Sequence, residues 1–133
     1  MTDLPDVRPI FIDTSVVIQA LRADPVTLSQ LAAVETFISA TVVGELYFGA
    51  HRSAHFDKEV SKITAFIAHS TIVPCDHDTG VLYGAIKNAL QQSGTLIPEN
   101  DMWIAASALQ HGLPLATRDG HFANVPGLMI AEW

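Results

Sequence analysis

The chain has 133 residues, 49% of them hydrophobic, and its formal net charge at pH 7 is −7. These values exclude a disordered chain and predict a single domain that spans residues 1–133. The sequence has no long apolar run and no secretory signal pattern, and Cys75 is its one cysteine. We therefore expect a cytoplasmic protein with no membrane segment and no internal disulfide. Because proteins that hold nucleic acid through phosphate contacts alone are usually basic, this acidity reflects either ordinary solubility or a nucleic-acid role that uses local charge, a metal ion or a partner.

The first apolar run predicts a buried strand at about residues 8–12, and it ends at a carboxylate, Asp13. A helix is expected from 14 to 22, with Thr14 and Ser15 as candidate caps. In open parallel sheets, ligands bind at the carboxyl ends of the strands. A carboxylate between two apolar elements is costly to bury unless something pairs with it, so Asp13 is the first candidate site residue.

The remaining elements alternate in the same way along the chain. Residues 1–8 are predicted to form an N-terminal extension before the first strand. The helix over 41–50 is apolar on nearly every face, so we expect it to be buried. The alternation predicts an α/β fold, with a mostly parallel sheet and helices on both of its faces. Further strands are expected at 35–39, 71–73, 113–117 and near 128–130, and further helices at 26–33, 55–69, 77–93 and 99–111.

Four of the fourteen acidic residues are not explained by a solvated face or a turn. They stand at the end of a buried strand, alone in an apolar helix, at the start of another apolar helix and after a late strand: Asp13, Glu45, Asp101 and Asp119. If all strands point the same way, Asp13 and Asp119 lie at the same edge of the sheet. The alternative is that the four are separate caps and buried hydrogen-bonding groups.

Bringing such carboxylates together has a large electrostatic cost. Two of them about 4 Å apart repel by roughly 4 kcal/mol at an effective dielectric near 20. The helix dipole stabilises the Asp101 carboxylate by only about 0.3–1 kcal/mol. A cluster therefore requires shared protons or a divalent cation. Oxygen ligands select Mg²⁺ or Mn²⁺, and a carboxylate-bound metal with open water positions is typical of phosphodiester hydrolases.

Four segments in order resemble the PIN-domain ribonucleases, and most closely the VapC-type toxins of bacterial type II toxin–antitoxin pairs. The segments carry the family's first acid after the opening strand, its ELxxGA helix, its IPxNDxxIAA segment and its LxTx[DN]xxF ending with PGL. They are Ile12–Ser15, Ser39–Ala50, Ile97–Ala106, and Leu115–Phe122 with Val125–Leu128. The resemblance covers nearly the whole chain.

The resemblance implies a three-layer α/β/α sandwich and a Mg²⁺-dependent endoribonuclease, with Mn²⁺ as a substitute metal. It also implies a homodimer, an antitoxin protein that covers the active site, and an RNA substrate. The family suggests transfer RNA as that substrate. The alternative function is a catalytically weak PIN-fold module that scaffolds or regulates a partner complex.

By residue, the resemblance makes Asp13 and Asp101 the main metal ligands, with Glu45 completing the acidic pocket and helping to position the water. Asp119 matches a fourth position where many relatives have Asn, so it is the least defined catalytic and metal-binding member. Two hydroxyls are expected to orient the carboxylates by hydrogen bonds, those of Thr14 and Thr117.

The basic residues leave several alternatives open. Three arginines are candidates to grip flanking phosphates or are plain surface residues: Arg22, Arg52 and Arg118. His121 follows Asp119 closely and is a candidate for acid–base chemistry, but an ordinary loop histidine is the favoured interpretation. A zinc site at His51 and His55 or at Cys75 is not expected, because the ligand spacing does not fit.

Overall fold

The computed structural model describes residues 7–133, which form a five-stranded sheet of order β3-β2-β1-β4-β5. Every neighbouring pair of strands is parallel, so the predicted mostly parallel sheet is confirmed and has no antiparallel member among the described residues. The strands are β1 Arg8–Ile12, β2 Val34–Ser39, β3 Thr71–Val73, β4 Leu115–Thr117 and β5 Ile130–Glu132.

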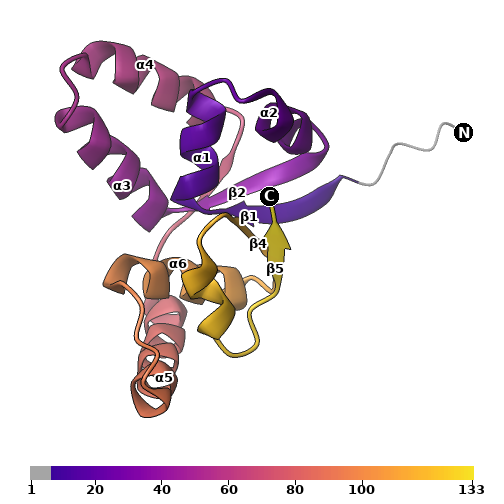
Figure 1. Ribbon diagram of the computed structural model, residues 1–133, viewed down its shortest axis with the longest axis vertical. Helices are drawn as coiled ribbons and strands as arrows, with labels where there is room; N and C mark the ends of the chain where they lie inside the picture. Colours follow the sequence, from indigo (N-terminus) through magenta and orange to yellow (C-terminus); the bar gives the residue numbers. More distant parts are fainter. Residues whose placement is uncertain (1–6) are drawn as a thin grey trace, which may run out of the picture.

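The helices cover both faces of the sheet, which confirms the α/β fold with three layers. Figure 1 shows α1 to α4 on one side of the sheet and α5 with α6 on the other. Within residues 7–133, none of the helices is long and apolar enough to cross a membrane. The helices are α1 Thr14–Leu21, α2 Pro25–Ala32, α3 Ala40–His51, α4 Phe56–Ile67, α5 His77–Ser93 and α6 Glu99–Gln110, with a short 3₁₀ helix η1 at Gly120–Asn124.

The central strand β1 carries the middle of the core because it has a partner strand on each side. Phe11 and Ile12 are completely buried, and Phe11 is opposite Phe37 of β2 and Leu115 of β4. After the strand, the backbone N–H of Asp13 still donates to the carbonyl of Ala116, at 3.0 Å. The start of α1 is therefore fixed directly beside the end of β4.

Helix α6 packs closely because a run of small residues, 105–108, lies in its middle. Ala105, Ala106 and Ala108 are completely buried, as is the nearby Ile104. A small side chain lets the helix axis approach its neighbours, so the helix has little freedom to shift. This places Asp101, in the first turn of α6, at a defined position relative to the sheet.

Two expectations about the elements are wrong. Helix α3 is not buried on every side: Val42, Leu46 and Ala50 form one buried stripe, while Phe48 is 61% exposed. The helix packs mainly against β2, α4 and α6, and its outer face faces away from them. The last strand begins at Ile130 rather than near 128, because a turn with Gly127 at φ 78° occupies the preceding residues.

Smaller differences lie at element ends. The expected strand over 113–117 is shortened to β4, and η1 was not expected at all. Most of the extension predicted over residues 1–8 lies outside the described residues, and Arg8 already belongs to β1.

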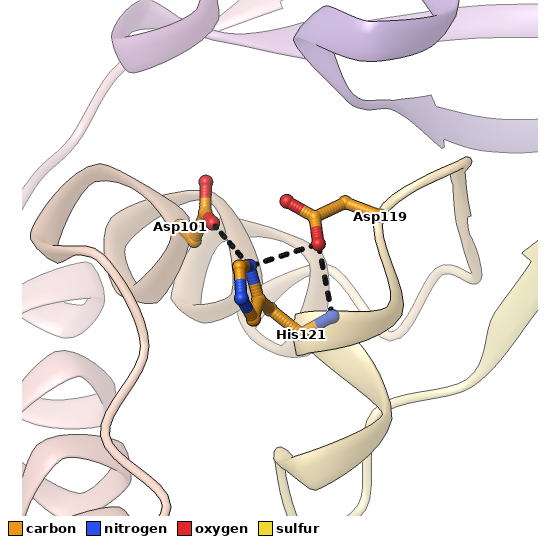
Figure 2. Close-up of side chains that lie close together, drawn as sticks. All are labelled: Asp101, Asp119 and His121. Carbon is orange, nitrogen blue, oxygen red and sulfur yellow. Dashed lines mark hydrogen bonds and ion pairs between the residues drawn. The ribbon is translucent and has the colours of Figure 1, made fainter.

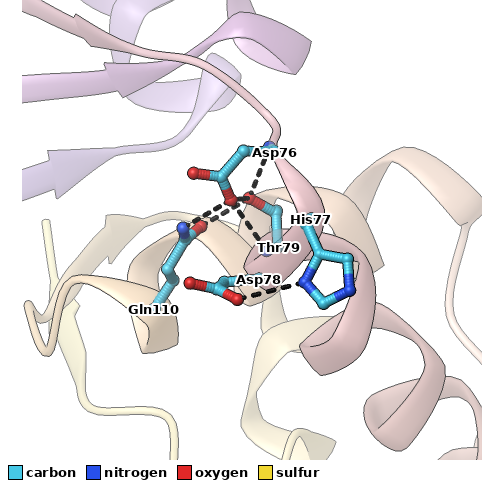
Figure 3. Close-up of polar contacts among 5 residues, drawn as sticks. All are labelled: Asp76, His77, Asp78, Thr79 and Gln110. Atoms are coloured by element: carbon cyan, nitrogen blue, oxygen red, sulfur yellow. Dashed lines mark hydrogen bonds and ion pairs between the residues drawn. The ribbon is translucent and has the colours of Figure 1, made fainter.

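Helix α5 is joined to α6 by a polar network at its N-terminus, which Figure 3 shows. The Asp76 carboxylate accepts from the backbone N–H of Thr79 at 3.1 Å, and the Thr79 hydroxyl accepts from the N–H of Asp76 at 3.0 Å. This is a capping box. Gln110 of α6 donates to the same carboxylate at 2.8 Å. These hydrogen bonds lower the pKa of Asp76, that from the Thr79 N–H most strongly.

We predict that Asp76→Ala lowers the midpoint of urea denaturation at pH 7, because three donors lose their acceptor. The stabilisation from this ionised carboxylate is present above the ordinary pKa of an aspartate and is lost as the pH falls through the lower folded-state value. Asp78→Ala is the matched control, since Asp78 lies in the same first turn with its side chain 79% exposed. Equal midpoints for the two variants would contradict a capping role for Asp76.

Candidate active site

The carboxyl ends of neighbouring strands bring the predicted acidic residues to one edge of the sheet. Asp13 follows β1, Asp119 follows β4, and Glu45 lies on the helix that follows β2. Asp101 comes from the other layer, in the first turn of α6. The strand order reverses between β1 and β4, which is where ligands bind in open α/β sheets. We call the four carboxylates Asp13, Glu45, Asp101 and Asp119 the acidic cluster.

Asp13 is 4% exposed, and hydroxyl groups fix its carboxylate. Ser15 and Thr117 each donate to Oδ2 of Asp13, at 2.8 Å. Asp13 is the N-cap residue of α1, yet its side chain makes no capping hydrogen bond. The expectation that Thr14 and Ser15 cap the helix is therefore wrong, because these hydroxyls point to carboxylates instead.

Glu45 is oriented in a similar way from the neighbouring helix. Thr14 donates its hydroxyl to Oε1 of Glu45 at 2.8 Å, which joins the start of α1 to α3. Ser39 caps α3 by accepting from the N–H of Val42, so the helix begins directly at the end of β2. Two consecutive hydroxyl residues, Thr14 and Ser15, thus hold two different carboxylates of the acidic cluster.

His121, two residues after Asp119, also reaches the acidic cluster, as Figure 2 shows. His121 places Nδ1 at 2.9 Å from Oδ1 of Asp119 and at 4.0 Å from Oδ2 of Asp101. The same Asp119 oxygen accepts from the backbone N–H of His121 at 2.9 Å, which begins η1. One potential ligand atom from each of Asp101, Asp119 and His121 lies within 4.8 Å of the others.

Asp101 experiences the electrostatic cost of the acidic cluster. Its pKa is raised to about 6, first by burial and then by the negative charges of Asp13, Asp119 and Glu45 in that order, while His121 opposes them. Its side chain is only 14% exposed, so solvent screens these charges incompletely. The carboxylate is thus partly protonated near pH 6 unless a positive charge arrives.

The donor set of the acidic cluster fits a hard divalent cation. Within residues 7–133, His121 is the only basic side chain within ion-pair distance of the four carboxylates, and no lysine or arginine neutralises them. Oriented carboxylate oxygens without a fixed counter-charge are the ligands that Mg²⁺ and Mn²⁺ prefer. The structure thus contains an acidic cluster that can hold a metal ion.

Two cavities flank the acidic cluster and contain two of the predicted arginines. A cavity of about 300 Å³ is lined by Thr14, Glu45 and Arg22, among residues of α1, α3 and α4. A second cavity of about 290 Å³ shares Thr117 and Asp119 with the site and includes Arg118. The third candidate is different: the guanidinium of Arg52 lies over the ring of Phe48, 5.6 Å from its centroid.

The sequence interpretation missed two members of this site. His121 was favoured as an ordinary loop residue, but η1 folds it back onto Asp119. Its spacing of two residues from an acid at the start of a turn was the available signal. Ser15 was considered only as a cap, although its hydroxyl serves both Asp13 and the backbone N–H of Arg118, at 3.2 Å.

The PIN domain family matches residues 10–128, which is most of the chain. The chain belongs to the PIN-domain family. It is 32% identical over 127 residues to Ribonuclease VapC2 of Haemophilus influenzae (strain KW20 / Rd), covering 92% of this chain and 96% of the relative. It is also 28% identical over 97 residues to the tRNA(fMet)-specific endonuclease VapC of Salmonella typhimurium, covering 72% and 74%. The expected membership of the VapC ribonucleases is confirmed.

Solved structures agree on the fold. VapBC2 from Rickettsia felis, bound to a DNA fragment from its promoter, superposes with a TM-score of 0.89 at 24% identity and covers 94% of this chain and 98% of that one. VapBC-5 from Mycobacterium tuberculosis, described as a member of the VapBC family of toxin-antitoxin systems, gives a TM-score of 0.72 at 25% identity and covers 92% and 95%. PIN nucleases are metal-dependent, in agreement with the acidic cluster.

We predict that the metal-free protein loses stability as the pH rises from about 4 to about 6. The pKa of Asp101 is higher in the folded state than in the unfolded chain, so unfolding releases a proton in this range. The shift from the ordinary value of 3.8 to about 6 corresponds to about 3 kcal/mol. Asp101→Asn removes this cost, and in chelator at pH 7.5 it raises the free energy of unfolding measured in urea.

The matched control is Asp57→Asn, because Asp57 also lies in the first turn of a helix but is exposed. It gives no such gain at pH 7.5. A metal-free Asp101→Asn variant that is less stable than the wild type at this pH would contradict the proposed repulsion in the acidic cluster.

Proposed function

We propose that this protein is a Mg²⁺-dependent endoribonuclease that hydrolyses RNA phosphodiester bonds as the toxin of a toxin–antitoxin pair. The observation that carries the proposal is the acidic cluster of a PIN-domain chain, held by hydroxyl groups and left without a neutralising lysine or arginine among the described residues. We further propose that residues 1–133 act as a single PIN-like domain.

Asp13 and Asp101 are proposed as the main metal ligands, with Asp119 and Glu45 as the other acidic members. Mg²⁺, or Mn²⁺ in its place, supplies the charge that lowers the pKa of a bound water and offsets the charge developing on the phosphate. The hydrogen bonds from Ser15 and Thr117 keep the Asp13 carboxylate in one orientation, and so reduce the reorganisation needed on binding.

The remaining groups act on the water and on the RNA. Glu45, whose Oε1 accepts from Thr14, has its second oxygen available to accept a proton from the attacking water. Arg22 and Arg118 line the two cavities beside the acidic cluster and are proposed to bind phosphates that flank the cleaved bond. Local positive charge of this kind is needed because the whole chain carries a net charge of −7.

The comparisons support the partners of this proposal. A relative is named a tRNA(fMet)-specific endonuclease, which makes transfer RNA the first substrate to test. A neighbouring solved structure is a toxin-antitoxin system, and we propose that a cognate antitoxin covers the acidic cluster of this chain as well. A homodimer acting in the cytoplasm completes the proposal.

We predict that the purified protein cleaves RNA with Mg²⁺ and not with excess chelator. Asp13→Asn and Asp101→Asn each reduce the cleavage rate by about 100-fold or more, because they remove charge that acts in the transition state. Cleavage is followed by gel electrophoresis of a labelled transfer RNA, with the exposed Asp57→Asn variant as control. Binding of RNA without cleavage would instead favour the alternative function, a catalytically weak PIN-fold module.

We also predict that Mg²⁺ raises the melting temperature of the protein, because it neutralises the acidic cluster only in the folded state. Thr117→Val weakens the apparent Mg²⁺ affinity by about 10- to 100-fold, since Asp13 loses one of its orienting hydroxyls. The affinity is obtained from the midpoint of a Mg²⁺ titration of the melting temperature. Thr64→Val is the control, because the Thr64 hydroxyl bonds only within α4. Identical Mg²⁺ midpoints for both variants would contradict this role of Thr117.

A further inference from the structure

The cavity between β4, η1 and β5 has features that the cleavage chemistry does not use. It holds about 290 Å³ and is lined by residues that include Arg118, Ala123, Ile130, Glu132 and Trp133. We call it the Trp133 cavity. Its volume lies near the lower end of the range for small-molecule sites, so it suits one flat ring system rather than a folded segment of a partner.

The main chain of Trp133 is held by a hydrogen bond from the end of the neighbouring strand β4. Arg118 follows β4 and donates its Nε–H to the main-chain oxygen of Trp133 at 2.9 Å. Trp133 is half-buried, packs against the hydrophobic core and lines the cavity. The backbone N–H of Arg118 is itself bound to Ser15, which also holds Asp13.

We propose that the Trp133 cavity is a nucleobase-binding subsite, in which a base next to the cleaved phosphodiester stacks on Trp133. The proposal rests on the proposed ribonuclease function and adds to it the residues that bind the flanking base. Single-stranded RNA is recognised by stacking of unpaired bases on aromatic rings and guanidinium planes, and the Trp133 cavity is lined by one residue of each kind, Trp133 and Arg118.

The charges of the cavity favour a base over a second phosphate. Glu132 lines the cavity and repels a phosphate group, whereas its carboxylate can accept a hydrogen bond from a base amino group. Arg118 is the one basic side chain in the lining, and its Nε is bound to Trp133, which leaves its terminal N–H groups for the flanking phosphate proposed above. The apolar side chains of Ala123 and Ile130 complete a surface suited to an uncharged ring.

The position of the cavity also points to a base. Thr117 and Asp119 belong both to its lining and to the acidic site. We therefore expect a base next to a phosphate at the acidic cluster to reach the Trp133 cavity. The cavity beside Glu45 lies on the other flank and has no aromatic residue in its lining.

The first experiment measures nucleotide binding without cleavage. Trp103→Phe leaves Trp133 as the single tryptophan of the chain, since the sequence has two. The ring of Trp103 stacks on Tyr83 at 4.1 Å between α5 and α6, away from the cavity. In this background, adenosine 5′-monophosphate is expected to quench Trp133 fluorescence with a saturable dependence, and ribose 5-phosphate is expected not to. Equal quenching by both compounds, or none by either, would overturn the proposal.

Two matched arginine variants test whether the nucleotide binds in the Trp133 cavity. Arg118→Gln is expected to weaken adenosine 5′-monophosphate binding by about tenfold, because the cavity loses its one basic side chain and the main chain of Trp133 loses the hydrogen bond from that side chain. Arg8→Gln alters an exposed arginine at the amino end of β1, whereas the cavity lies at the carboxyl ends of the strands, and it is expected to leave binding unchanged. Equal effects of the two variants would mean that binding reflects general charge and would overturn the assignment.

The second experiment uses cleavage in the otherwise wild-type protein. Trp133→Ala is expected to raise KM for RNA by about tenfold with little change in kcat, and Trp133→Phe to restore most of the loss. If Trp133→Ala does not fold, Trp133→Phe and Arg118→Gln still give the comparison. Cleavage with KM unaffected by Trp133→Ala, or by Arg118→Gln where Trp133→Ala does not fold, would overturn the subsite and leave the proposed function standing. Saturable quenching without any RNA cleavage would support the subsite and remove the ribonuclease function.

Discussion

The structure of this site depends on the buried carboxylate of Asp13, which is held by hydroxyl groups and not by a cation. Ser15 and Thr117 both donate to it, one from the following helix and one from the neighbouring strand. These bonds join the carboxyl ends of β1 and β4 around one charge. Because a hydroxyl fixes the direction of a carboxylate without neutralising it, the charge remains available to a divalent ion.

The other three members of the acidic cluster are more exposed than Asp13. Thr14 orients Glu45, and the Asp119 carboxylate begins η1 and contacts His121. Asp101 enters from the opposite layer with a pKa raised to about 6, first by burial and then by the other carboxylates. A site with this much uncompensated charge stores a cost in the metal-free fold, and binding of a cation releases it.

The two flanks of the site differ in chemistry. The cavity beside Glu45 is bordered by helices α1, α3 and α4, whereas the Trp133 cavity is bordered by strand ends and η1. Only the latter combines an aromatic ring with a guanidinium, and the contact between Arg118 and Trp133 links it back to the site through Ser15. The proposed base subsite would give an acidic protein a means of holding RNA that does not depend on a basic surface.

The sequence by itself determined the alternation of strands and helices and the acidic residues that end them. Apolar runs next to single carboxylates are local patterns, so the chain alone identifies Asp13, Glu45, Asp101 and Asp119 as candidates. Strand direction could also be inferred, since helical crossovers between strands favour parallel pairing. The expected full burial of α3 and the expected start of β5 were wrong, because burial and register depend on which neighbours are present.

Only the tertiary structure decided what the polar side chains do. The resemblance implies that the Thr117 hydroxyl orients a carboxylate, but Thr117 and Asp13 are 104 residues apart, and nothing in either segment specifies that Asp13 is its partner. The same holds for His121, whose ring is turned toward Asp101 by a single 3₁₀ turn, and for the cavity beside Trp133. Side-chain contacts across strands depend on register and on helix packing, and these are set by the whole core at once.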